Sequence, residues 1–304
     1  MKRTLISLSG IMLLLLLTTQ MLKAQTDLLF SNSLANPEVY NPSFVQHNGM
    51  INARLLNRQQ WIGFPDAPKL SYLGVDHFFE GQQMGLKLHV LSQSAGKEVT
   101  RRVTLDYIYR VFLKDNIELS FGLGAGFYQR QIQYSKLVYL EGNEPLIRPD
   151  ENYFRPDFEF GIHLNAGNFS AGYASNHLGD IGKDPSISRI PLHHHLYGVY
   201  QFELTDNYML RTALSYHQQG KVSYVQADAQ VFLGILQAGL GWRHLDAVIL
   251  KAGINITDYI GLHYAYDMGI NKLANFNSGT HEVLLQLRFS KPGGTYLSPR
   301  FLDY

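Results

Sequence analysis

The chain has no cysteine and few charged residues, and both absences narrow its class. Without cysteine it cannot be a disulfide scaffold, a thiolate metal site, a thiol-dependent enzyme or a lipoprotein that carries its lipid on cysteine. Charged residues make up 17% of the sequence, below the roughly 25% of ordinary soluble domains, while aromatic residues reach 12%. These values exclude a disordered chain and are unlike those of an average cytosolic enzyme.

Long apolar runs are also missing after the N-terminal region, which argues against an inner-membrane protein with helical spans. Within that region, residues 1–24 have the pattern of an export signal. Lys2 and Arg3 form its basic start, residues 5–17 are mostly apolar, and a cleavage site follows at Ala24. The apolar stretch is shorter than the roughly 20 residues that span a bilayer, so we expect a cleaved signal peptide rather than an anchor.

An excess of charge of one sign is absent as well. Once residues 1–24 are removed, 23 basic and 25 acidic side chains remain, which gives a formal net charge of −2. A nearly neutral chain has no electrostatic basis for binding nucleic acid, so we expect no nucleic-acid partner.

The sequence does contain a repeated alternation of apolar and polar residues with a period of two. In residues 116–127, Leu119 and Phe121 point one way, whereas Ser120 and Gly122 point the other, as in a β-strand. Similar segments recur along the chain, and several carry full charges on their polar face. The candidate strands, about fourteen in all, are residues 49–60, 70–79, 84–90, 102–111, 116–127, 157–165, 169–176, 192–202, 208–217, 223–232, 236–243, 248–256, 259–267 and 281–289.

This pattern predicts an all-β fold, a transmembrane antiparallel β-barrel of about 14 strands of the outer-membrane type. Connection lengths support it, because short turns alternate with longer connections, as they do in such barrels. The longer connections are residues 61–69, 92–98, 133–156, 177–191 and 268–278, which become surface loops if the N-terminus is periplasmic. Two connections at alternate positions, near residues 218–221 and 244–246, are short and fit less well.

The predicted layout has four parts. Residues 1–24 form the cleaved signal peptide, 25–48 an N-terminal periplasmic segment, 49–289 the outer-membrane β-barrel and 290–304 a C-terminal tail. The rival fold is a soluble β-sandwich or propeller. Apolar faces on nearly every strand would then need a very large core, and glycines with isolated charges on the polar faces are typical of a barrel lumen.

Several motifs resemble those of a known family. Residues 40–44 (Tyr-Asn-Pro-Ser-Phe) are similar to the asparagine-proline segment near the start of the PorP/SprF family of type IX secretion membrane proteins. Residues 58–69 resemble its signature around the first hairpin: an arginine, a tryptophan, a glycine and Ala-Pro-Lys. Residues 264–267 and 280–283 resemble its Tyr-x-Tyr-Asp and Ser-His-Glu-Ile pair, with Thr280 in place of the usual Ser. The motif positions, all of unknown role, are Asn41, Pro42, Arg58, Trp61, Gly63, Pro68, Asp267, His281 and Glu282.

The resemblance implies a non-enzymatic outer-membrane component of the type IX protein secretion system, which assists export or surface attachment of specific cargo proteins such as adhesins. It also implies three kinds of partner: other type IX secretion components, a secreted or surface cargo protein, and outer-membrane lipid. A porin or hydrophobic-solute outer-membrane channel is the alternative. An outer-membrane lipase or protease comes third, because no nucleophile motif is present.

The chemistry of the motif positions also allows purely structural roles. Trp61 stands where an interfacial aromatic residue would lie, and Pro68 marks a loop because it cannot donate to a strand ladder. Asp267, His281 and Glu282 lie on strands that would pair. They predict an inward hydrogen-bonded cluster near the seam where the barrel closes.

Three consecutive histidines, residues 193–195, suggest a metal site, because neutral imidazole is a common ligand. On a strand, however, His193 and His195 share a face while His194 opposes them, and no carboxylate stands close in sequence. We therefore expect no metal, no cofactor and no catalytic residues.

Overall fold

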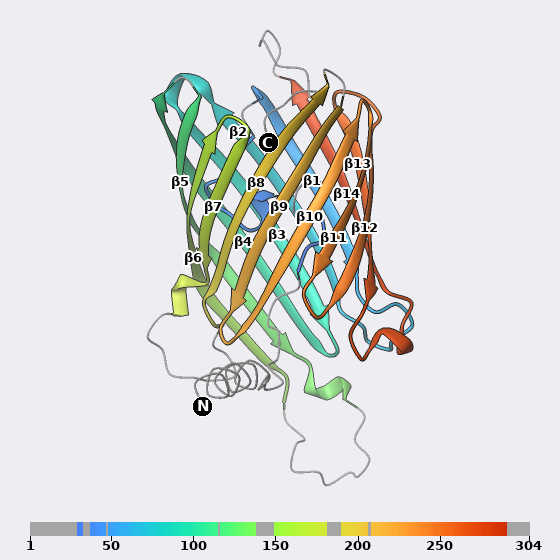
Figure 1. Cartoon of the computed structure of the whole chain (residues 1–304). Helices are drawn as coiled ribbons and strands as arrows, with labels where there is room; N and C mark the ends of the chain where they lie inside the picture. Colours follow the sequence, from blue (N-terminus) through green and yellow to red (C-terminus); the bar gives the residue numbers. More distant parts are fainter. Residues whose placement is uncertain are drawn as a thin grey trace, which may run out of the picture.

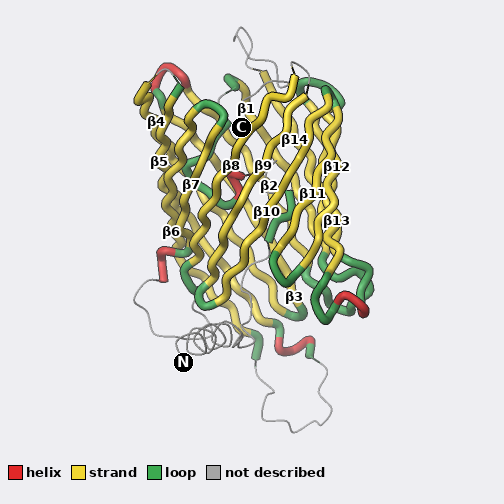
Figure 2. The backbone as a smooth tube through the Cα atoms, in the orientation of Figure 1, coloured by secondary structure: helices red, strands yellow, loops and turns green. Residues whose placement is uncertain are grey.

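The chain forms a closed barrel of antiparallel strands in the computed structural model (Figures 1 and 2). The structure describes residues 29–32, 37–46, 48–114, 116–137, 149–180, 190–205 and 208–290. Each strand pairs with its neighbours in sequence, and β14 closes the barrel on β1. The strands are β1 (Met50–Gln59), β2 (Lys69–Phe79), β3 (Met84–Ala95), β4 (Glu98–Lys114), β5 (Ile117–Ile132), β6 (Glu151–Ala166), β7 (Phe169–Asn176), β8 (His193–Thr205), β9 (Tyr208–Gln219), β10 (Val222–Leu233), β11 (Leu236–Arg243), β12 (Ala247–Asn255), β13 (Ile260–Gly269) and β14 (Thr280–Ser290).

All the candidate strands are present, so the predicted fold and strand number are confirmed. The differences are at strand ends. The loop predicted over residues 92–98 is wrong, because β3 and β4 continue to a tight turn in which Gly96 has a left-handed φ of 60°. Likewise, β6 begins inside the loop predicted over residues 133–156. The reason is that polar residues at the ends of these strands resemble loop residues in the sequence. Only their pairing with a neighbouring strand shows that they continue the sheet.

The barrel wall is apolar outside and polar inside, as the alternation predicts. On β5, Phe121 and Leu123 expose 38% and 63% of their surface, whereas Ser120 is buried in the lumen. On β4, Tyr107 is exposed and its neighbour Asp106 is fully buried. A closed wall with this exterior fits hydrocarbon rather than water, so the soluble sandwich and propeller are excluded.

The two ends of the barrel differ in the length of their connections. At the turn end, short connections join β2 to β3, β4 to β5, β6 to β7, β8 to β9, β10 to β11 and β12 to β13. The opposite end, called the loop end, carries the longer connections at residues 60–68, 133–150, 177–192 and 270–279. It also carries the tight turns at residues 96–97, 220–221 and 244–246, so the alternation of lengths is only partial.

Short 3-10 helices are the only helical elements among the residues described here. They are η1 (Pro37–Val39), η2 (Glu80–Gln82), η3 (Tyr134–Lys136), η4 (Leu178–Asp180) and η5 (Ala274–Phe276). Within the described ranges, no helix is long and apolar enough to cross a membrane.

The described residues before β1 lie inside the barrel (Figure 1, blue). Residues 29–32, 37–46 and 48 are called the plug, and all except Pro37 are buried. Residues 25–48 were expected in the periplasm, so the described part of this segment differs from the prediction. The physical reason is that its polar groups find partners on the charged inner wall. The predicted signal peptide, residues 1–24, and the tail after Ser290 lie outside the described residues.

Candidate functional site

Four charged side chains from four strands meet at the loop end of the lumen. This loop-end cluster consists of Arg58 on β1, Arg243 on β11, Asp267 on β13 and Glu282 on β14, all buried. Arg58 donates to Asp267 Oδ2 at 2.8 Å and to Glu282 Oε2 at 3.1 Å. Arg243 donates to the same Asp267 oxygen at 3.1 Å. Two cations therefore neutralise two anions where water is excluded, which is the condition for burying such charges.

The plug completes the loop-end cluster. Glu282 accepts the backbone N–H groups of Ser31 and Asn32 at 2.8 and 2.7 Å. The Ser31 hydroxyl donates to Asp267 at 2.8 Å and accepts from Arg58 at 2.7 Å. Three motif positions, Arg58, Asp267 and Glu282, are thus brought together around one plug residue.

A second set of contacts holds the plug nearer the middle of the barrel. The Glu38 carboxylate pairs with Arg54, which also pairs with Asp76 of the wall. Lys87 Nζ donates to the backbone carbonyl groups of Glu38 and Asn41 at 3.0 and 2.9 Å. All these groups are buried, so the charged inner wall and the polar plug satisfy each other.

Asn41 shapes the plug and attaches it to the wall. Its Oδ1 accepts from the backbone N–H and hydroxyl of Ser43 at 2.9 and 2.7 Å, the local pattern by which asparagine stabilises a turn. Its Nδ2 donates to the Ile162 carbonyl and the Tyr197 hydroxyl, both at 3.1 Å. The asparagine of the Asn-Pro motif is therefore a structural anchor of the plug.

Glycines on the inner wall make room for the same turn. A Cβ at Gly122 would lie 2.3 Å from the backbone nitrogen of Ser43. A Cβ at Gly161 would lie 2.1 Å from Asn41 Oδ1 and 2.9 Å from Pro42 Cδ. Only glycine allows the backbone of another segment to approach a strand so closely. The inward face that Gly122 shares with Ser120 is thus, at Gly122, the place where the plug touches the wall.

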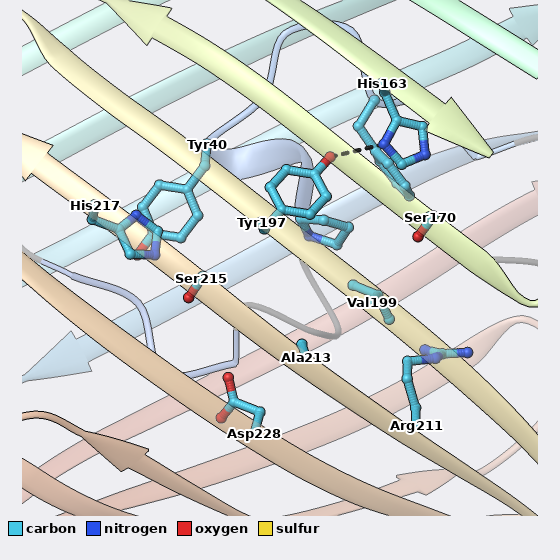
Figure 3. Close-up of a pocket in the computed structure, with 12 residues that line it drawn as sticks. Tyr40, His163, Ser170, Tyr197, Val199, Arg211, Ala213, Ser215, His217 and Asp228 are labelled. Atoms are coloured by element: carbon cyan, nitrogen blue, oxygen red, sulfur yellow. Dashed lines mark hydrogen bonds between the residues drawn. The ribbon is translucent and has the colours of Figure 1, made fainter. Parts of the chain in front are cut away.

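A small cavity remains between the plug and strands β6 to β10 (Figure 3). Tyr40 packs on His217 with ring centroids 4.6 Å apart, and the Tyr197 hydroxyl shares a 2.9 Å hydrogen bond with His163. The cavity measures about 40 Å³. This volume holds a few water molecules and is far below the roughly 300 to 1,000 Å³ of ligand pockets.

One group of residues has the spacing of a metal site within the described ranges: His89, Asp106 and Glu159. Lys87 Nζ lies 3.0 Å from Asp106, and Arg102 donates to Glu159 at 3.4 Å. These two cations already neutralise the two carboxylates, so a divalent ion would add uncompensated positive charge. The donor set fits an ion-pair network rather than a metal.

The three consecutive histidines point to alternate faces, as predicted. His193 and His195 are buried in the lumen, and His195 Nδ1 shares a 2.7 Å hydrogen bond with His217 Nδ1. His194 faces outward and shares a 2.9 Å hydrogen bond with the Tyr173 hydroxyl. His195 also packs on Tyr40 of the plug, with ring centroids 4.7 Å apart, so this histidine contacts both the wall and the plug.

Three motif positions lie in the connection between β1 and β2 at the loop end. Trp61 is half-buried, has a positive φ of 48° and lines a cavity of about 30 Å³ together with Leu29 of the plug. Gly63 is exposed with a φ of 100°, a conformation that strongly favours glycine. The Pro68 carbonyl accepts from the backbone of Gln60 at 2.9 Å and closes the loop.

His281 does not join the inward cluster, and the prediction is wrong for this residue. It is adjacent to Glu282 on β14, so its side chain points to the opposite face of the wall. There His281 Nδ1 shares a 2.5 Å hydrogen bond with the Tyr264 hydroxyl. Both residues line a groove on the outer surface, together with Tyr266.

The family comparison identifies the type of protein. The family described as type IX secretion system membrane protein PorP/SprF matches residues 22–287. The chain belongs to the PorP/SprF family. The resemblance noted in the sequence is therefore confirmed, and the protein is a membrane component of the type IX secretion system, in a family not known to be enzymatic. None of the curated proteins compared with the chain matches it.

Solved structures support the fold of this PorP/SprF protein. The toluene transporter TbuX of Ralstonia pickettii aligns with a TM-score of 0.51 at 8% identity, over 84% of this chain and 93% of TbuX. The monoaromatic hydrocarbon channel CymD aligns with a TM-score of 0.50 at 7% identity, over 88% of this chain and 94% of CymD. At such low identity the likeness concerns the barrel alone.

The exterior face of this membrane barrel leads to a first prediction. Leu123, near the middle of β5, should contact lipid, so Leu123→Arg should reduce the free energy of unfolding by roughly 2 to 4 kcal/mol near the midplane. Leu123→Met is the matched control and should cost less than about 1.5 kcal/mol. Denaturant titration of the barrel refolded into lipid vesicles measures both, and equal losses would contradict the assigned facing.

Proposed function

We propose that this PorP/SprF barrel assists the export or surface attachment of particular cargo proteins, such as adhesins. The family match over residues 22–287 carries the proposal. The filled lumen adds support, because a plug held by buried ion pairs would obstruct the passage of solutes through a passive porin. No catalytic role is proposed.

For orientation, we infer that the barrel spans the outer membrane with its loop end at the cell surface and its turn end in the periplasm. Longer loops at one end are typical of the surface side of outer-membrane barrels. In this arrangement β1 starts from the periplasmic side. Other type IX secretion components and the cargo are the expected partners.

The loop end offers a surface that suits a protein partner. Exposed apolar side chains gather on three neighbouring connections, which are joined by hydrogen bonds from Ile62 to Gly279 and from Ile270 to Asp246. This apolar patch consists of Phe64, Leu245, Ile270, Leu273 and Phe276. Exposed apolar side chains on connections that are hydrogen-bonded to one another can form a protein contact, so we assign cargo or partner binding to the patch.

A cargo assay tests this proposal. Phe276 exposes 71% of its surface, so Phe276→Asp should leave the barrel folded and abundant while it strongly reduces the cargo on the cell surface. Leu137→Asp is the matched control, because Leu137 is also an exposed apolar residue of a loop-end connection but lies outside the patch. The amount of cargo on the surface of cells with Leu137→Asp should remain close to that of cells with the unaltered protein.

Trp61→Ala separates the two interpretations of the first-hairpin motif. If Trp61 contributes to partner binding, surface cargo should fall while the amount of heat-modifiable barrel on gels is unchanged. If it only anchors the loop and the plug, barrel and cargo should fall together. The porin alternative predicts unchanged export with altered uptake of small solutes, and unchanged export after complete deletion would overturn the secretion proposal.

A further inference from the structure

The first four described residues of the plug lie in a pocket that matches them group by group. Phe30 packs against Tyr72 of the wall and Tyr40 of the plug, with ring centroids 6.1 and 5.4 Å apart. The two oxygens of Glu282 accept the consecutive N–H groups of Ser31 and Asn32. Charged acceptors make strong hydrogen bonds to backbone N–H groups, and here they act away from solvent.

The side chains of the segment are recognised as well. The Ser31 hydroxyl contacts Arg58, Arg243 and Asp267 at 2.7, 3.1 and 2.8 Å. The Asn32 amide donates to Glu282 Oε1 at 3.0 Å. An aromatic residue followed by serine and asparagine therefore meets a complete set of partners, which is more than a space-filling plug requires.

The buried side chains of this pocket's wall pair with one another directly, without a charge from the occupant. Arg58 bridges Asp267 and Glu282, and Arg243 pairs with Asp267 and with the exposed carboxylate of Asp246 at 3.1 Å. The segment from Leu29 to Asn32 contributes no charged side chain. Its departure would thus leave a pocket of paired charges that water could fill, and not a buried unpaired charge. The cost of release is limited to the contacts of the segment itself.

We propose that the loop end of the lumen is a peptide-binding site, and that Leu29–Asn32 is its resident ligand, which exchanges with a peptide of the same chemistry from another protein. The ligand class is a short peptide with an aromatic residue followed by serine and asparagine. This proposal goes beyond the secretion role, because it assigns peptide binding to the inner pocket, whereas the secretion proposal assigns partner binding to the exposed patch. It does not depend on the identity of the cargo.

A binding experiment on the full-length protein in lipid nanodiscs tests the exchange. The probe is a fluorescent synthetic peptide with the sequence of residues 27–34. Ser31→Ala with Asn32→Ala in the protein weakens the resident ligand, so this double variant should bind the probe about tenfold tighter than the unaltered protein does. A probe that carries the same two alanines should bind at least about tenfold more weakly, and a scrambled probe should show no saturable binding.

A wall substitution shows whether the probe occupies the pocket. Glu282→Gln in the double variant places an amide N–H group against the ligand N–H groups, and should reduce probe affinity by about tenfold or more. Because this change affects a buried ion pair, heat-modifiability on gels must show a folded barrel. If the Glu282→Gln barrel is not folded, the comparison of the alanine-substituted and scrambled probes with the original probe tests the proposal by itself. No saturable binding to the double variant, or equal binding of the three probes, overturns the proposal. Neither result bears on cargo export.

Discussion

Replacing Arg58 with alanine should reduce the free energy of unfolding by about 3 to 5 kcal/mol, the usual cost of leaving a buried partner charge uncompensated. Arg58 contacts both Asp267 and Glu282, and its loss would leave Arg243 as the remaining cation of the loop-end cluster. The same substitution removes a donor to Ser31, so the plug should also be less firmly held. Denaturant unfolding in lipid vesicles measures the loss.

Arg101→Ala is the matched control for this prediction. Arg101 lies on β4, is exposed on the outer face and donates a long, 3.4 Å hydrogen bond to the half-buried Gln129. Surface substitutions of this kind usually change stability by less than about 0.5 kcal/mol. Similar losses for Arg58→Ala and Arg101→Ala would show that the loop-end cluster does not stabilise the barrel.

The wall of the barrel could be predicted from sequence because its pattern is local. Alternating residues such as Phe121 and Ser120 fix the two faces of a strand wherever that strand is paired. The ends of strands were less predictable. Ser92 and Ser94 resemble loop residues in composition, and only their pairing with β4 shows that the strand continues.

The plug could not be predicted in this way. Its residues show no period of two, and their partners are far away in sequence, as for Ser31 and Glu282, which are 251 positions apart. A signal was nevertheless present in the full charges on inward faces, such as Lys87 and Asp106. Buried charges need partners, and a lumen with so many of them indicates that something polar fills it. Arg243 belongs to this group and was missed for the same reason.

The contacts of the motif residues could be predicted only in part from the local sequence. Asp267 and Glu282 were expected to face inward together, and the structure places both beside Arg58. His281 was expected with them, although neighbouring residues on a strand cannot share a face. The Asn-Pro motif had no structural interpretation from sequence, because the contacts of Asn41 with Ile162 and Tyr197 require the closed barrel.

The contact between Gly122 and the plug leads to the prediction with the most visible outcome. A Cβ at this position would lie 2.3 Å from Ser43 N and 2.4 Å from Pro42 C, and both are backbone atoms that cannot rotate away. Gly122→Ala should therefore push the turn of the plug off the wall. The strand itself accepts alanine, so the barrel should still form.

Displacement of the plug should convert a closed lumen into a conducting one. In a planar lipid bilayer, Gly122→Ala should give frequent stepwise channel openings, and the unaltered protein should give few. Gly198→Ala is the matched control, because a Cβ at Gly198 meets only Phe169 at an ordinary 3.8 Å. Heat-modifiability on gels verifies that each barrel is folded. Equal conductance of the two folded variants would mean that the turn at Asn41 to Ser43 does not block the lumen, and that the buried plug contacts serve the stability of the wall instead.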